Sequence, residues 1–501
     1  MPAPGSHRSR RPWRAAALAA AGLASAAAVG TAAPPQVDLL VTRERITAEA
    51  SRGVPAEVAE LFAGSVPPVA FLVNRGGPLD VAVRRTPGTD DWEAARLVDG
   101  VSAPVPAEVP AGPRGLGRAV VASVLDRQRR VVRRVALTVC PGAGALRLGP
   151  GGPAHSGFPS RCSSHPFARG VRLGLDTDYG VPIDLGRVVG AGLRAGRYTV
   201  RLRVRPATAA WLGMPADGRS ATLRLLVRPA RDEDGAAVEG DDVLVVGLPG
   251  AHQAVNVPAP AADPPADTLP DLAALPAYGF RVVRTGRRDM LDFNATVWNA
   301  GPGPLIVEGF RRGGAPRMDA YQFFRREDAD VAAVRVGDLD YDFRSRHDHW
   351  HFRDFARYSL VRPDGSPVVT SPKEAWCLAP TDVIDQLVPN AALEPGDGLL
   401  SSACGEASAP NVREVLEAGA GDTYTVDTPG QPIDVTRVPN GTYALKIEAN
   451  PAGRLREVTR ADDVALRTIV LAGRPGRRTV SAPPADGVDT EGWARRGRPL
   501  R

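Results

Sequence analysis

The sequence predicts a mainly β protein, with two β-sandwich-like domains joined by a Pro/Ala-rich linker and little helix. Glycine contributes 53 and proline 48 of the 501 residues. Between these turn formers, apolar and polar residues alternate in short runs, notably residues 198–204, 222–227, 443–449 and 465–470. Such alternation buries one face of a strand, as in antiparallel sandwiches. Few segments have the helical period, and 409–419 is the clearest of them.

The chain divides near its middle. Residues 251–270 combine proline, alanine and aspartate without periodicity, which is typical of a linker between domains. An N-terminal β-rich module is therefore expected at residues 34–250, and a second domain at 271–475. Residues 476–501 have few aliphatic side chains and many arginines, so we expect a disordered basic tail there.

Two sequence phrases occur in both halves, in the same order. An Asn-initiated Gly/Pro turn between two strands appears at residues 71–85 and again at 295–312. A glycine two residues before a tyrosine then begins the strands around Tyr198 and Tyr443. The N-terminal module is thus predicted to be a degenerate, non-catalytic repeat of the second domain. The alternative is that such phrases recur in unrelated sheet sandwiches.

Residues 1–33 have the three parts of an export signal peptide: a basic start, an apolar run at 15–30, and small residues where a peptidase could cut. We expect the mature chain to begin near Pro34 and to be secreted or extracellular, with the cell envelope as a further location. The apolar run has 16 residues, and roughly 20 are needed to span a bilayer. Membrane attachment is therefore expected only if this segment stays uncleaved.

Four cysteines suit an exported protein with two disulfides. Pairing Cys140 with Cys162 and Cys377 with Cys404 is the simplest of the three possible connectivities. The sequence has no C-x-x-C metal motif.

Charge distribution argues against nucleic-acid binding by the second domain. Residues 271–475 contain 24 basic and 29 acidic residues, a net charge of −5, whereas a phosphate-binding surface is basic. Among the 62 basic residues of the chain, only Lys373 and Lys446 are lysine. Lysine carries a primary amine that can be deprotonated and form covalent bonds, which arginine cannot do. Each lysine therefore either has a chemical role that needs a primary amine, or is a chance exception in a chain that otherwise uses arginine.

Three of the seven histidines, His347, His349 and His351, alternate within residues 346–352. On a strand they share one face, so their imidazoles can converge on one ion, and such a set suits Cu(II) or Zn(II). Asp348 points to the opposite face, and Asp354 could orient a ligand. The alternatives are a solvated strand, a zinc site or a cupin-like barrel. Aromatic cover is expected from Phe343, Trp350, Phe352, Phe355 and Tyr358.

Residues 347–360, HDHWHFRDFARYSL, resemble the copper-binding strand of the lysyl oxidases. Three further stretches resemble that family in the same order: the start of its catalytic domain at 269–272 and 291–305, its K-x-x-F-C-L segment at 372–378, and its tyrosine segment at 421–451. Together the four motifs extend over about 200 residues.

This resemblance implies a copper amine oxidase that builds its own lysine tyrosylquinone, here from Lys373 and Tyr424. It also implies a primary amine substrate, either peptidyl lysine or a small amine, that is oxidised by dioxygen to an aldehyde with release of hydrogen peroxide and ammonia. The candidates for the catalytic base are Asp354, Asp422 and Asp434. Two alternatives remain: a secreted copper-binding protein without oxidase activity, and a zinc-dependent hydrolase.

Overall fold

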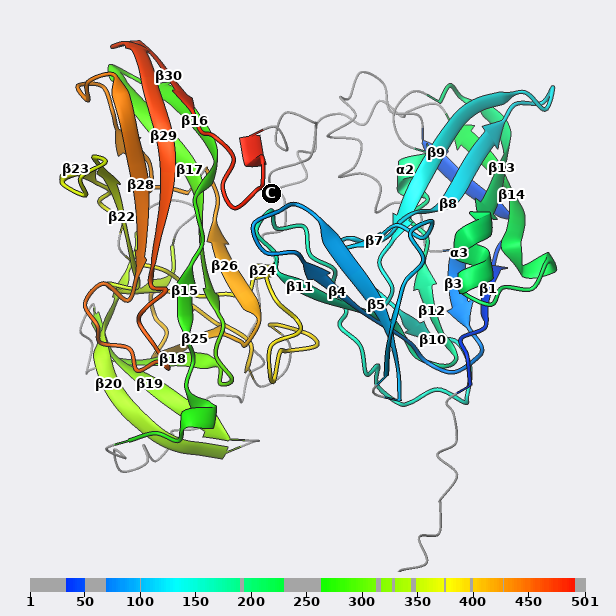
Figure 1. Ribbon diagram of the computed structural model, residues 1–501, viewed down its shortest axis with the longest axis horizontal. Coiled ribbons are helices and arrows are strands. Elements are labelled where there is room, and N and C mark those ends of the chain that lie inside the picture. The colour runs from blue at the N-terminus through cyan, green and yellow to red at the C-terminus, as the bar shows by residue number, and fades with distance from the viewer. Residues whose placement is uncertain are drawn as a thin grey trace, which may run out of the picture.

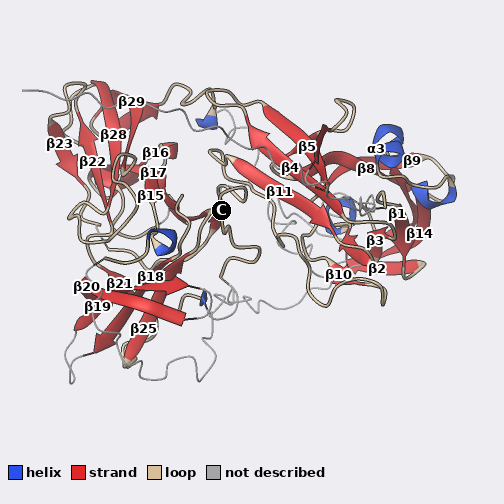
Figure 2. Cartoon of the chain, turned by 60° about the horizontal axis from the view of Figure 1, so that its bottom comes forward, coloured by secondary structure: helices blue, strands red, loops and turns tan. Residues whose placement is uncertain are grey.

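A computed structural model of the protein describes residues 33–49, 69–99, 101–189, 193–228, 263–311, 317–326, 329–343, 348–373, 375–396, 400–426 and 428–491. Strands dominate these residues and the helices are short (Figure 2), so the mainly β prediction is confirmed. The export signal lies outside the described residues except for Ala33. No described helix is long and apolar enough to cross a membrane.

The N-terminal unit contains three sheets. The first has the order β1 (Val37–Val41), β3 (Ala70–Asn74), β12 (Tyr179–Pro182), β10 (Leu146–Arg147). The second has the order β11 (Gly170–Leu175), β4 (Leu79–Arg85), β5 (Trp92–Val98), β6 (Val101–Pro104). The third has the order β2 (Arg45–Glu49), β14 (Ser220–Arg228), β13 (Gly196–Val204), β8 (Gly115–Leu125), β7 (Ala111–Gly112), and β9 (Val131–Val139) also pairs with β8. The helical turns are α2 (Gly186–Val189), α3 (Pro206–Trp211) and η2 (Asp217–Arg219).

The C-terminal unit, which begins with the helical turn η3 (Ala266–Thr268), also contains three sheets. One has the order β15 (Leu272–Ala274), β17 (Arg288–Asn299), β26 (Ala420–Tyr424), β24 (Asp382–Val383), with β16 (Tyr278–Thr285) and β27 (Ile433–Asp434) also on β17. Another has the order β21 (Trp350–Phe352), β20 (Ala329–Tyr341), β19 (Arg317–Arg326), β18 (Leu305–Arg311), β25 (Asn411–Leu416). The last has the order β23 (Pro367–Thr370), β22 (Ala356–Val361), β28 (Gly441–Ala449), β29 (Val464–Arg474), β30 (Arg477–Ser481).

Each unit has its own hydrophobic core. One buried cluster draws its residues from between Val37 and Val227, and the largest cluster of the C-terminal unit draws its residues from between Leu272 and Leu471. The alternation that predicted the strands is the cause: along β13, Val200, Leu202 and Val204 are buried while the arginines between them are exposed. The two disulfides, Cys140–Cys162 and Cys377–Cys404, follow the local pairing, one in each unit.

Two sequence predictions are wrong. Residues 409–419 are not a helix, because Asn411–Leu416 form β25, which pairs with β18 over its whole length. Cross-strand pairing here overrides a short helical period. The tail is not disordered from residue 476 onward either. Arg477–Ser481 form β30, which follows a turn at Gly476 (φ 86°) and pairs with β29. A glycine in the left-handed region next to alternating residues is a hairpin signal that a count of aliphatic residues misses.

The two units contact each other through the start of β11 and the residues after β24. In Figure 1, β4 and β11 lie beside β24 and β26. The N–H of Arg169 donates to the carbonyl of Ile384 (2.7 Å), and the N–H of Gln386 donates to the carbonyl of Gly170 (3.0 Å). A Cβ on Gly170 would lie 2.2 Å from Asp385 Oδ1, so any larger residue here would displace the Asp385 side chain.

His165 lies at the centre of this contact and is only 4% exposed. Its ring stands edge-on against Tyr278 of the C-terminal unit. Burial lowers the pKa of His165 to about 4; the Asp382 carboxylate opposes this shift and the Arg85 guanidinium adds to it. The native protein therefore holds His165 in its neutral form at neutral pH.

We predict that acid weakens the protein through His165. In the unfolded chain this histidine binds a proton near pH 6.5, and in the native state only near pH 4, so native stability is lost as the pH falls between these values. The loss is at most about 3 kcal/mol. His165→Gln should remove this part of the pH dependence, measured as the free energy of unfolding in denaturant at pH 7 and pH 4.5. The same change at the exposed His155 is the control, and equal slopes in all three proteins would contradict the prediction.

Candidate metal and cofactor site

His349 and His351 lie side by side at the start of β21. Asp340 of β20 pairs with His351, which is 3% exposed, and the two imidazole centres are 4.5 Å apart with the rings inclined at 33°. Trp350 between them is fully buried. The predicted strand is shorter than expected, since β21 begins at Trp350 and His349 precedes it. Even so, both imidazoles are presented together.

His347 lies outside the described residues. Within the described ranges, no group of three or more His, Cys, Asp or Glu side chains is arranged to hold a metal ion. Burial lowers the pKa of His349, as does the positive charge of Lys373. A neutral imidazole is the form that binds a metal, so the lowered pKa of His349 favours its role as a donor.

Lys373 lies above the ring of Tyr424. Its Nζ is 4.6 Å from the centre of that ring, and the residue is only 5% exposed. The Ser371 hydroxyl accepts a hydrogen bond from the N–H of Lys373 (3.2 Å) and donates to the carbonyl of Gln431 (2.9 Å). These bonds fix the main chain from which the lysine extends. No local pattern brings together two residues 51 positions apart, and only the resemblance of motifs predicted that they share a site.

Tyr424 ends β26 and pairs with Ala295 of β17. Its hydroxyl accepts a hydrogen bond from the N–H of Cys377 (2.7 Å) and donates to the carbonyl of the same residue (3.2 Å). The Trp376 ring lies against the Tyr424 ring with centres 4.1 Å apart. The phenol is therefore held on one face by Trp376 and at its oxygen by the main chain of Cys377.

The histidine strand and the lysine segment are joined directly. The N–H of Phe352 donates to the carbonyl of Trp376 (2.7 Å), and the N–H of Trp376 donates back to Phe352 (3.0 Å). A cavity of about 380 Å³ opens between them. The cavity is lined by Asp340, Tyr341, Asp342, Phe343, His351, Pro372, Lys373 and Ala375. The imidazole of His351 and the amine-bearing Lys373 thus line the same cavity. Phe343 is 79% exposed, so the prediction that it covers the histidines is wrong.

Two carboxyl groups are buried around the tyrosine. Asp422 Oδ2 accepts a hydrogen bond from Ala379 (3.3 Å), and Glu414 Oε2 accepts one from Leu378 (3.1 Å). Burial raises the pKa of both well above the usual range, and the negative charge of Asp422 raises that of Glu414 further, while the charge of Lys373 lowers both. Carboxyls of this kind can hold a proton near neutral pH. Sequence reasoning named Asp422 as a candidate but missed Glu414. Glu414 lies in β25, a segment that the sequence predicted to be a helix.

The other two candidate bases have different surroundings. Asp354 forms an ion pair with Arg454 (3.1 Å). Asp434 accepts a hydrogen bond from the Thr436 hydroxyl (2.6 Å), and this bond lowers its pKa. Asp434 lies opposite Met290 at the far part of β17, whereas Tyr424 lies opposite Ala295. Of the three carboxylates proposed from the sequence, Asp422 is the one next to the tyrosine.

A family model decides what kind of domain this is. The model described as lysyl oxidase matches residues 326–476. Residues 326–476 are a lysyl oxidase domain. The match includes the histidines, Lys373 and Tyr424, and its family implies a copper amine oxidase, which is an oxidoreductase. No curated protein matches the chain at a significant level.

The lysyl oxidase domain contains residues that fit the copper and quinone of its family. Two adjacent imidazoles are present for copper, and an amine lies over a phenol ring for the cofactor. Near that ring, Glu414 Oε1 is buried without a hydrogen-bond partner among the described residues. An unsatisfied buried polar atom needs an explanation, and a catalytic role or an unmatched bound group is one.

We predict that Glu414 lowers the stability of the domain as the pH rises. Its pKa is raised on folding, so its contribution is fully present below about pH 4.5 and is lost as the pH rises through the folded value. Glu414→Gln keeps the shape without the charge. The free energy of unfolding, measured in denaturant, should therefore rise in this variant relative to the unaltered protein as the pH increases from 5 to 8. Glu394→Gln, at an exposed position, should show no gain; parallel curves for Glu414→Gln would contradict the assignment.

Proposed function

We propose that the domain is a copper-dependent amine oxidase whose lysine tyrosylquinone forms from Lys373 and Tyr424, with His347, His349 and His351 as the copper ligands. The observation that carries the proposal is the 4.6 Å separation between Lys373 Nζ and the Tyr424 ring centre. The two imidazoles beside this pair support it. When bound and formed, copper and the quinone supply the oxidation of a primary amine to an aldehyde by dioxygen, with release of hydrogen peroxide and ammonia.

The side chains of the domain have separate tasks in this proposal. Cys377 orients the phenol through its main chain, and Trp376 restricts the ring to one tilt. Ser371 holds the lysine main chain, and the methylene chain carries the amine from there to the ring. Asp422 and Glu414 hold or accept protons next to the reacting ring, because burial has raised their pKa values.

The aromatic part of the cavity wall suits a cationic substrate. Tyr341 and Phe343 contribute rings to this wall, and aromatic faces stabilise cations. The Asp340 carboxylate in the same wall is already paired with Arg317 (2.9 Å) and Arg353 (3.0 Å). A primary amine, either a small one or the side chain of a peptidyl lysine, is therefore the proposed substrate, with dioxygen as the oxidant. The export signal and the two disulfides support a secreted protein that works outside the cytoplasm.

The test of this proposal is a covalent link between two peptides. Copper-loaded protein is reduced, digested with trypsin and mapped by mass spectrometry. Cleavage at Arg413 separates the peptide carrying Lys373 from the one carrying Tyr424, unless the two are cross-linked. We expect the cross-linked pair, together with hydrogen peroxide production that depends on an added primary amine.

The second lysine provides a matched control. Lys373→Arg should abolish both the cross-link and peroxide production, since a guanidinium cannot form the link. Lys446→Arg should leave both unchanged, because Lys446 pairs with Glu448 on β28, outside the site. Bound copper without a cross-link would instead indicate a copper-binding protein that is not an oxidase. Bound zinc, with a hydrolytic activity that survives Lys373→Arg, would indicate the hydrolase.

A further inference from the structure

The two units share most of their strand order in all three sheets, although β2 joins β14 in parallel whereas β30 joins β29 in an antiparallel direction. The order β1-β3-β12 corresponds to β15-β17-β26, and the order β11-β4-β5-β6 corresponds to β25-β18-β19-β20. The strands β9, β8, β13 and β14 pair in the same sequence as β23, β22, β28 and β29. The disulfides correspond too. Cys140–Cys162 joins the segment after β9 to the segment before β11, and Cys377–Cys404 joins the segment after β23 to the segment before β25. Independent sandwiches have no reason to agree in this many connections.

Individual side chains repeat as well. The Asn74 amide donates to the carbonyls of Gly77 and Leu175, and the Asn299 amide donates to those of Gly303 and Leu416. In each unit, the turn after a strand is held to a second sheet by one buried asparagine. The tyrosines agree too, since each hydroxyl donates to the carbonyl four residues earlier, Tyr198 to Arg194 and Tyr443 to Pro439.

The N-terminal unit lacks the reactive residues at the matching positions. Where Tyr424 lies opposite Ala295, the N-terminal unit has Ile183, whose N–H donates to the carbonyl of Ala70 (2.8 Å). Between β6 and β8, where the C-terminal unit has its histidines between β20 and β22, there is no histidine, and no lysine occurs before Lys373. The unit therefore keeps the fold without the chemistry.

A chain of hydrogen bonds leads from this unit to the back of the tyrosine strand. His165 Nδ1 accepts a hydrogen bond from the N–H of Phe167 (3.1 Å), so the neutral ring carries its proton on Nε2. Nε2 then donates to Thr296 Oγ1 (3.0 Å), which in turn bonds to Thr423 Oγ1 (2.8 Å). Thr423 precedes Tyr424 on β26, and neighbouring strand residues point to opposite faces. The N-terminal unit thus contacts one face of the strand whose other face presents the tyrosine.

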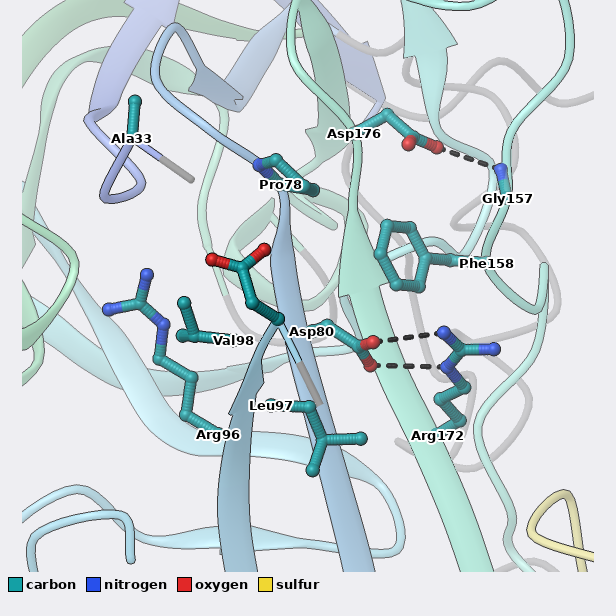
Figure 3. A pocket seen from close by; sticks show the side chains of 11 residues that line it. Ala33, Pro78, Asp80, Arg96, Leu97, Val98, Gly157, Phe158, Arg172 and Asp176 are labelled. Carbon is teal, nitrogen blue, oxygen red and sulfur yellow. Dashed lines mark hydrogen bonds and ion pairs between the residues drawn. The ribbon is translucent and has the colours of Figure 1, made fainter. Parts of the chain in front are cut away.

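The segment that carries His165 is held on both sides. Figure 3 shows the wall of a cavity of about 330 Å³ in the N-terminal unit, where Asp80 accepts two hydrogen bonds from Arg172 (3.1 and 2.9 Å). In the same wall Asp176 accepts one from the N–H of Gly157 (2.9 Å). The Arg172 guanidinium lies over the Phe158 ring, and the main-chain N–H of Arg172 donates to the side-chain oxygen Oε1 of Gln386 in the C-terminal unit (3.1 Å). These contacts at Phe158 and Arg172 hold the chain on both sides of His165.

We propose that the N-terminal unit is a copy of the catalytic fold that has lost the reactive site and now positions it, with His165 as the positioning residue for β26 and so for Tyr424. The inference rests on the proposed function only in naming Tyr424 as the cofactor tyrosine. The contact itself exists without copper or quinone. It can therefore be tested in metal-free protein, separately from any activity.

The experiment measures backbone hydrogen exchange of the full-length, metal-free protein, followed by cross-link yield and copper affinity after loading. In His165→Phe, which keeps a ring but loses both hydrogen bonds, residues 420–426 should exchange about tenfold faster, while β28 and β29 stay unchanged. The cross-link yield should fall by a similar factor. Copper affinity should not change, because His351 lies in β21, which belongs to a different sheet from β26. His165→Gln, which keeps a donor for Thr296, should restore most of both losses.

Two further variants keep the test decisive. Thr296→Val breaks the same chain of hydrogen bonds with a side chain of equal size, and it answers the question if His165→Phe does not fold. His155→Phe, an exposed histidine of the same unit, should behave as the unaltered protein. Exchange of residues 420–426 within about twofold of the unaltered protein in both His165→Phe and Thr296→Val would overturn the inference. If the unaltered protein forms no cross-link, the proposed function fails, and the exchange data alone decide whether His165 positions β26.

Discussion

The pairing of β26 with β17 is the constraint on which the candidate site depends. This pairing places Tyr424 opposite Ala295 and turns its ring toward Lys373 and Trp376. A slip of one residue would turn Thr423 inward and Tyr424 toward the N-terminal unit, because side chains alternate between faces. Thr423 is bonded on one face through Thr296 to His165, and the Tyr424 hydroxyl is bonded on the other to Cys377. Both faces therefore fix the same register.

The site buries three ionisable side chains, which is unfavourable for folding. Lys373, Asp422 and Glu414 are each at most 5% exposed. Burying charged groups is unfavourable unless they are paired or neutralised. Burial raises the pKa of both carboxyls, which favours their protonated forms, and the charge of Lys373 opposes that shift in both. Perturbed pKa values of this kind are common at functional sites.

The sequence predicts features that depend on neighbouring residues better than features that depend on contacts between distant segments. Alternation predicted the strands, because burial of one face is a local property, and the spacing of the histidines predicted that His349 and His351 lie together. The likeness of motifs brought Lys373 and Tyr424 into one site, which no local pattern could do. Glu414 could not be found, because its place depends on β25 pairing with β18. The role of His165 is hidden for the same reason, since its partners Thr296 and Thr423 lie in the other half of the chain.

Lys373 illustrates how a rigid scaffold can contain one movable part. The chain is fixed before it by Ser371, whose hydroxyl bonds to Gln431, and after it by Trp376, whose main chain bonds twice to Phe352. Between these fixed points the lysine contributes a flexible side chain that ends above the ring. An amine already held next to its target gains the effective concentration that an amine in solution lacks. The ring must be held as firmly as the lysine main chain, because the amine can reach the ring only within the length of its own side chain.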